Sequence, residues 1–106
     1  MTDMRMTHST AAVLQALDAG LRYGFDIVEA TGIRGGTVYP VLRRLEAAGL
    51  VASEWESPEI GRRQGRPSRK YYELLPSATG VVDQARARYP LPGPVNGTPM
   101  GAAGRA

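Results

Sequence analysis

Apolar residues recur at the three- and four-residue spacing of a helix in four parts of this chain of 106 residues. The spacing predicts helices over residues 9–19, 24–31, a stretch that starts near Gly36–Thr37, and 77–89. Three glycines are placed to end the first three helices: Gly20, Gly32 and Gly49. Ser9 is a candidate N-cap for the first helix, and Pro76 precedes the last one.

Each of these helices carries several apolar side chains, and those of the third helix are expected to point inward. The apolar residues are Ala12, Val13, Ala16, Leu17, Phe25, Ile27, Val28, Val38, Val41, Leu42, Leu45, Val81, Val82 and Ala85. Pro40 falls inside the third helix, where a proline costs ~3 kcal/mol in the interior but little in the first turn. The helix therefore either begins at Gly36–Thr37, or begins earlier and is kinked at Pro40.

Two stretches, Leu50–Glu56 and Arg69–Leu75, alternate in the way that strands do. We expect Val51 and Trp55 to point inward, and Trp55 and Tyr72 to belong to the core under the hairpin. Residues 57–68 are predicted as a loop, and a helix is not expected in 61–72, GRRQGRPSRKYY. The order of three helices, strand, basic loop, strand and helix predicts a winged helix-turn-helix, mainly α with a small antiparallel β-wing.

The helix-turn-helix can be tested on its spacing. A steep turn between two helices needs a residue that tolerates unusual backbone angles, and Gly32 supplies it. Apolar residues must lie on both sides of the turn so that the helices share a core, and four do: Ile27, Val28, Ile33 and Val38.

The chain divides into a domain over residues 1–89, with terminal helices for dimerisation, and a tail. Residues 90–106 hold eight Gly or Pro and little to bury, which predicts a disordered segment. No apolar run approaches the roughly 18–20 residues of a membrane helix, and the first residues lack the apolar core of an export signal. We therefore expect a cytoplasmic protein with no membrane partner.

Charge adds the first indication of a partner. The chain has 13 Lys or Arg against 10 Asp or Glu, and five of these cations fall in 61–72 without an acid. Three more lie just before or on the third helix: Arg34, Arg43 and Arg44. Such clustering on a modest net charge of +3 favours a localised anionic partner such as a nucleic acid backbone. A merely solvated basic loop is the alternative.

On the third helix, Thr37 and Tyr39 lie near the N-terminus, the end that inserts toward DNA in such motifs. Thr37 could equally be an N-cap, and Tyr39 a buried aromatic residue. Arg43 lies one turn on, opposite the apolar face, whereas Arg44 either joins it or pairs with an acid such as Glu46.

Two segments, GGTVYPVLRRLEAAGLV and GRPSRKYYELLPSATG, resemble the PadR family of bacterial winged-helix transcriptional regulators over residues 9–89. The resemblance implies a homodimer that usually represses transcription. Thr37, Tyr39, Pro40 and Arg43 would then face the major groove and flanking phosphates, and Arg66, Arg69 and Lys70 the backbone or minor groove. Many relatives dimerise through a longer C-terminal helix packed on the partner's first helix. Since the closing helix is brief here, dimerisation would lean on residues 1–19, and a small-molecule effector is not indicated.

Chemistry points away from an enzyme. His8 is the single histidine, cysteine is absent, and neither a P-loop, a Gly-x-Ser-x-Gly motif nor a set of metal ligands occurs. We expect no cofactor and no metal, and predict a sequence-specific regulator that binds double-stranded DNA as a homodimeric repressor. A winged-helix protein-interaction module and a ligand sensor stay open as alternatives. The candidate DNA-binding residues are Thr37, Tyr39, Pro40, Arg43, Arg44, Arg62, Arg63, Arg66, Arg69 and Lys70.

Overall fold

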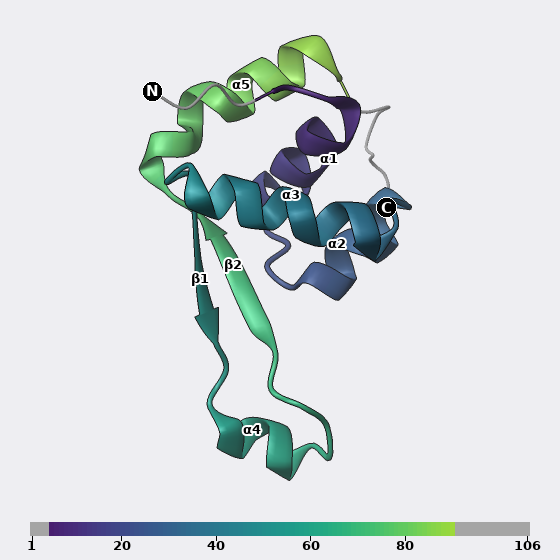
Figure 1. The fold of residues 1–106 in the computed structure, drawn as a ribbon, viewed down its shortest axis with the longest axis vertical. Coiled ribbons are helices and arrows are strands. Elements are labelled where there is room, and N and C mark those ends of the chain that lie inside the picture. The colour runs from purple at the N-terminus through teal and green to yellow at the C-terminus, as the bar shows by residue number, and fades with distance from the viewer. Residues whose placement is uncertain (1–4, 91–106) are drawn as a thin grey trace, which may run out of the picture.

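The structure, a computed structural model, describes residues 5–90. Its elements are α1 (His8–Asp18), α2 (Gly24–Thr31), α3 (Gly35–Ala47), β1 (Val51–Trp55), α4 (Pro58–Arg63), β2 (Lys70–Leu74), the short 3-10 turn η1 (Pro76–Ala78) and α5 (Thr79–Arg88). Figure 1 shows a body of helices from which the two strands extend, with α4 at the far end of the hairpin. The predicted winged helix-turn-helix is confirmed. Most of the predicted tail, residues 91–106, lies outside the described residues.

The core lies where α1, α2, α3, α5 and the base of the sheet meet. Its largest fully buried side chains are Leu14, Ile27, Leu42, Leu45, Val13, Val38, Val41 and Val51. Phe25, although apolar, is 54% exposed. It follows Gly24 in the first turn of α2, where only one face of the helix contacts the body, and Ile27 takes that face.

α1 begins one residue earlier than predicted, and its N-cap is Thr7 rather than Ser9. The Thr7 hydroxyl oxygen accepts a hydrogen bond from the Thr10 amide at 3.1 Å. Farther along α1, Gln15 Nε2 donates to the Tyr89 carbonyl at 2.8 Å. In addition to this hydrogen bond, the apolar faces of α1 and α5 pack on each other within one chain.

The turn between α2 and α3 forms as predicted. Gly32 adopts a φ of 73°, the left-handed conformation that favours glycine. Ile27 and Val38 on either side of it are fully buried, and Ile33 is partly buried against the same core. α3 begins at Gly35, which is the earlier of the two starts considered, and it continues through Pro40.

The wing is an antiparallel hairpin in which Val51 pairs with Leu74 and Trp55 with Lys70. Its tip was wrongly predicted to be loop throughout, since Pro58–Arg63 forms α4. Ser57 caps this helix by accepting from the Glu59 amide at 3.3 Å, and Pro58 occupies the first turn, where proline is tolerated. Gly61 is buried, and a Cβ there would lie 2.7 Å from the Arg66 carbonyl oxygen. Glycine therefore allows α4 to pack directly on the returning chain.

Candidate nucleic-acid interface

α3 turns one face to the core and the other to solvent. Burial of Val38, Val41, Leu42 and Leu45 leaves Thr37, Arg43 and Arg44 exposed. Neither arginine forms an ion pair within residues 5–90, and Glu46 instead accepts from Ser53 Oγ at 2.6 Å. Both guanidinium groups are thus available to an external anion.

The N-terminus of α3 is open. Its N-cap residue, Arg34, makes no side-chain hydrogen bond to the first turn in the described part of the chain. Thr37 lies inside the helix, and its amide donates to the Arg34 carbonyl at 2.9 Å, so the alternative that Thr37 is the N-cap is wrong. Unpaired amides at a helix N-terminus, together with the helix dipole, favour a phosphate.

Tyr39 joins α3 to α2 while keeping part of its ring in solvent. Its side chain is 36% exposed. A Cβ added at Gly24 would lie 2.4 Å from Tyr39 Cε1, so the ring rests directly on the backbone of α2. Burial, followed by the nearby Tyr23, raises the pKa of Tyr39 above its ordinary value. The residue therefore has a packing role as well as an accessible edge.

The wing sheet has two different faces, because side chains alternate along each strand. One face carries Ser53, Trp55, Lys70 and Tyr72, and the bond from Ser53 to Glu46 turns this face toward α3. The other face carries Glu54, Tyr71 and Glu73. Lys70 thus lies on the side of the wing that faces α3, and Glu54 and Glu73 lie on the opposite side.

Trp55 was wrongly predicted to be buried. Its side chain is 63% exposed, whereas Tyr72 on the same face is buried as expected. Alternation places Trp55 on the α3 side of the sheet, but the strand has by then run past the helix that would cover it (Figure 1). The Lys70 ammonium lies 5.7 Å from the centre of the Trp55 ring, a cation–π contact.

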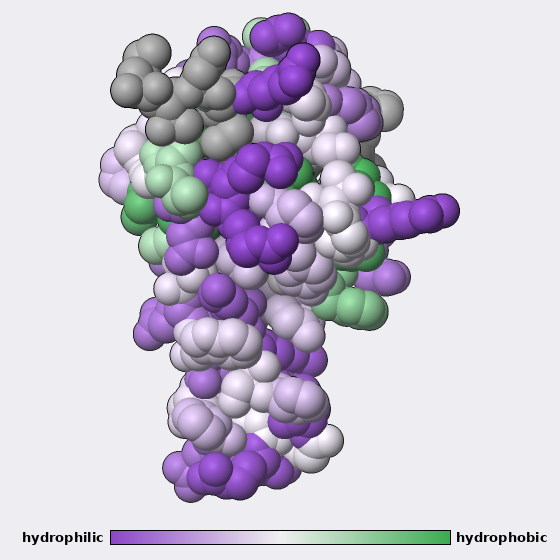
Figure 2. All heavy atoms as spheres, viewed as in Figure 1, coloured by the Kyte–Doolittle hydropathy of each residue, from purple (hydrophilic) through white to green (hydrophobic). Residues whose placement is uncertain are grey.

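Two further cations lie at the tip. Arg62 and Arg63 occupy the last turn of α4 and are exposed, and neither pairs with an acid in the described residues. Figure 2 shows hydrophilic residues gathered at this end of the wing. Cations in a last turn also suit the negative end of the helix dipole.

Arg69 differs from its neighbour Lys70. Its guanidinium carbon lies 4.5 Å from the centre of the Tyr23 ring, at the link between α1 and α2. A hydrogen bond to Tyr71 is the main cause that raises the pKa of Arg69 above its ordinary value. Its Nε is buried and finds no hydrogen-bond partner among residues 5–90. Arg69 therefore joins the wing to the helical body.

Arg66 is turned into the wing. Its Nη1 and Nη2 donate to the two carboxylate oxygens of Glu56 at 2.7 and 3.0 Å. The hydrogen bond from Arg66 is the largest cause that lowers the pKa of Glu56, to about 2. Sequence reasoning missed Glu56 altogether, and placed Arg66 with the free cations because nothing in the pattern paired the two.

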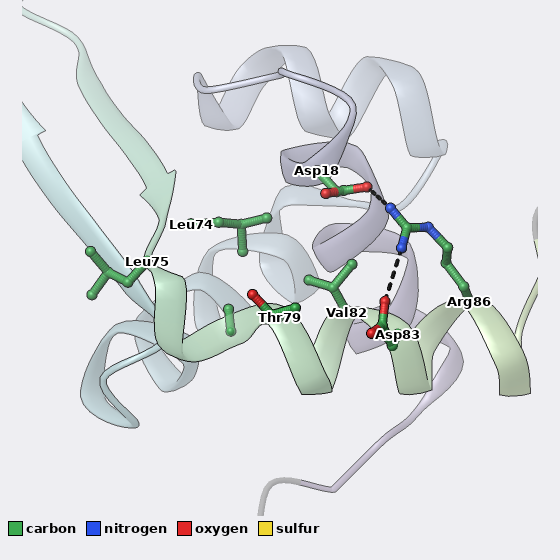
Figure 3. Close-up of a pocket in the computed structure, with 8 residues that line it drawn as sticks. Asp18, Leu74, Leu75, Thr79, Val82, Asp83 and Arg86 are labelled. Atoms are coloured by element: carbon green, nitrogen blue, oxygen red, sulfur yellow. Dashed lines mark hydrogen bonds and ion pairs between the residues drawn. The ribbon is translucent and has the colours of Figure 1, made fainter.

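Hollows of different sizes indent the surface formed by residues 5–90. One of about 180 Å³ lies between α1 and α5, and Figure 3 shows Arg86 reaching across it to Asp18 and to Asp83 of its own helix. A wider one of about 470 Å³ is open beside Trp55 and Tyr71. Residues 5–90 contain no helix long and apolar enough to cross a bilayer and no cluster of potential metal ligands.

Comparison with known proteins agrees with this geometry. A PadR family regulator from Clostridium difficile superposes with a TM-score of 0.65 at 20% identity, over 77% of this chain and 86% of that one. A PadR family regulator from Eggerthella lenta gives 0.59 at 28% identity, over 76% and 73%. Bordetella bronchiseptica BpsR, whose DNA binding is regulated by 6-hydroxynicotinic acid, gives 0.61 at 28%, over 79% of this chain and 59% of that one.

Curated protein sequences gave no significant match. Residues 13–78, however, match the family described as the transcriptional regulator PadR-like family. This match spans the helix-turn-helix, the whole wing and the turn that leads into α5. The chain therefore belongs to the PadR-like family of transcriptional regulators.

Proposed function

We propose that this DNA-binding regulator represses transcription as a homodimer on an inverted-repeat operator. The observation that carries the proposal is the common orientation of α3 and of one wing face: Arg43 and Lys70 are cations on the two elements, and the bond between Glu46 and Ser53 joins α3 to that same face. A duplex that received α3 in its major groove would meet this face of the wing on its flank. Because the proposed target is chromosomal DNA, we place the protein in the cytoplasm.

The proposed contacts are of two kinds: contacts to base edges, which read the sequence, and contacts to phosphates, which position the protein on the duplex. Arg43 is assigned to a base edge in the major groove, because it is long, exposed and forms no ion pair among the described residues. The phosphate contacts are assigned to the first turns of α3, to Arg44 and to the wing: Thr37, Tyr39, Pro40, Arg44, Arg62, Arg63 and Lys70. Arg69, whose guanidinium lies on the Tyr23 ring, is assigned to the contact between the wing and the body instead. Arg66, whose guanidinium is occupied by Glu56, is treated separately below.

Two arguments support the proposed homodimer: the resemblance to the family, and the twofold symmetry that dimeric DNA-binding proteins share with their operators. Within one chain α1 is already covered by α5, so two protomers would meet through other surfaces or exchange α5 helices. Sedimentation equilibrium at micromolar concentration tests the proposed dimer. A protein that is still monomeric at this concentration would contradict it.

No effector is proposed. The hollow beside Trp55 and Tyr71, about 470 Å³, is open to solvent rather than enclosed. The hollow between α1 and α5, about 180 Å³, is smaller than the roughly 300–1,000 Å³ of ordinary ligand sites. It is also bridged by the ion pairs of Arg86.

Arg43→Ala tests the reading role, on an operator obtained by selecting bound fragments from the organism's own genome. A bidentate arginine–guanine contact supplies about 1–3 kcal/mol of discrimination, so the variant should lose about tenfold or more on the operator and much less on a scrambled duplex. Thr37→Ala serves as the control, with similar losses on both duplexes. Equal losses for Arg43→Ala on the two would make it another phosphate contact. A wild-type chain that binds neither duplex would favour the protein-interaction module.

A further inference from the structure

The side chain of Glu56 is the most occupied acceptor of the wing. It lies just after β1, is 6% exposed, and receives hydrogen bonds from three separate residues. Arg66 donates twice, at 2.7 and 3.0 Å, the Arg69 amide donates at 3.2 Å and the Tyr71 hydroxyl at 3.3 Å. The backbone of Glu56 adds a bond, from its amide to the Arg69 carbonyl at 2.8 Å. The carboxylate thus joins both arms of the hairpin where the β-ladder ends.

Arg66 contributes to the same connection between the two arms of the hairpin. Its side chain is 19% exposed, and all three guanidinium nitrogens donate within the wing: to Glu56, to Gln64 Oε1 at 3.0 Å and to the Pro67 carbonyl at 3.1 Å. Its amide donates to the Gly61 carbonyl at 2.9 Å, which fixes the returning chain on α4. A guanidinium held by so many internal acceptors is poorly placed to bind a phosphate as well.

We propose that Glu56 and Arg66 form a lock that positions the wing for DNA, and that Arg66 acts through this lock rather than by touching a phosphate. The lock sets the position of α4, which carries Arg62 and Arg63, relative to the strand that carries Lys70. Both members are positioning residues. The inference rests on the proposed DNA-binding role of the wing, and its first test needs no DNA.

The two explanations, positioning of the cations and simple electrostatics, predict opposite changes in DNA affinity for one substitution. Glu56→Gln removes a negative charge close to the cations of the wing, so electrostatics alone would strengthen the binding of any duplex. Loss of the lock would weaken it, because the tip cations would no longer be held in place. Arg66→Met changes the charge in the opposite direction and should weaken binding too.

Hydrogen exchange of the DNA-free protein measures the lock directly. In Glu56→Gln and in Arg66→Met, amides of residues 56–71 should exchange about tenfold faster or more, because charge-assisted bonds are lost, while the helical body is unchanged. Glu54→Gln is the matched control, since it removes the same charge from an exposed neighbour, and it should exchange like the wild type. Wing exchange that stays at the wild-type rate in both lock variants overturns the proposal.

Binding to a fluorescent duplex of mixed sequence gives the second readout. Glu56→Gln should bind several-fold more weakly than Glu54→Gln, although the two chains carry the same net charge. The double variant Glu56→Gln, Arg66→Met should be no weaker than the worse single one, since both remove one interaction. Glu56→Gln binding as tightly as Glu54→Gln would overturn the lock's role in DNA binding.

Arg62→Met separates a direct contact from the lock, because it should weaken binding without changing wing exchange. If the wild-type chain binds no duplex at all, the proposed function fails, and the exchange experiment still decides whether the lock exists. Should Glu56→Gln unfold the whole domain, Arg66→Met examines the same contact from its other partner.

Discussion

The helical body and the wing of this protein are held together by different forces. The body buries aliphatic side chains almost completely, with Leu14, Leu42 and Leu45 among those without exposed surface. In the wing beyond the β-ladder, the charged side chains of Glu56 and Arg66 are only 6% and 19% exposed, and every residue of α4 except Gly61 is exposed. One region depends on summed apolar area, and the other on a few directional contacts.

The difference matters for how each region responds to change. Apolar burial is non-directional and shared among many neighbours, so the body should unfold as one cooperative unit. The wing depends on bonds that one substitution or one proton can remove, so it should open locally while the body stays folded. The DNA binding proposed for both regions would then be lost by two distinguishable routes.

Truncation of the body core should give the largest effect. Leu42→Ala removes a fully buried side chain of α3 and should lower the free energy of unfolding by about 2–5 kcal/mol. Urea denaturation followed by circular dichroism measures this loss. Arg44→Ala, on the exposed face of the same helix, is the control and should change stability by about 0.5 kcal/mol or less. Similar losses for the two variants would contradict an apolar body.

A smaller effect is expected where α2 and α3 touch. In Gly24→Ala the new methyl group would lie 2.4 Å from the Tyr39 ring, and displacing the ring should cost about 1–3 kcal/mol. Gly36→Ala, with nothing within 4 Å of its new methyl group, should instead be neutral or stabilise the helix by up to about 1 kcal/mol. Thermal unfolding of both variants distinguishes the sites, and an undisturbed Gly24→Ala protein would show that Tyr39 moves freely.

Acid should loosen the wing, with the smallest change in overall stability. The pKa of Glu56 is lowered to about 2 from an ordinary value of 4.5 by the hydrogen bond from Arg66, with further contributions from Arg69 and Tyr71. A lowered pKa means that the carboxylate stabilises the wing above about pH 4.5 and loses this effect as the pH falls toward 2. Carbon-13 NMR of the Glu56 carboxyl should show a midpoint near the lower value, and wing resonances should shift with it. In Arg66→Met the midpoint should return toward the ordinary value.

The body was predictable from the sequence because helical periodicity reports burial directly. Ile27, Val38 and Leu42 lie inside as their spacing indicates, and Gly32 has the backbone conformation that the turn requires. The error at Trp55 has a physical cause: alternation gives the side of a strand on which a residue lies, but not how far the covering element extends. The start of α4 at Ser57-Pro58-Glu59 did carry a helix signal, which the glycines that follow concealed.

The polar part of the wing was less predictable for a physical reason. Glu56 and Arg66 are ten residues apart, and no periodicity links a residue at the end of a strand to one beyond a short helix. Charge clustering correctly located the basic segment, yet it could not separate the exposed Arg62 and Arg63 from the paired Arg66. Only the folded hairpin shows which cations an anion could reach.

The exposed indole on the wing has a practical consequence. Trp55 is the single tryptophan of the chain, is 63% exposed and stands beside Lys70 on the face turned toward α3. Its emission therefore comes from the wing alone, and the spectrum should be that of an indole in water. Docking of this face on a duplex would exclude water and bring bases or sugars near the ring, so intensity and wavelength should both change. The protein thus contains its own fluorescent reporter on the wing.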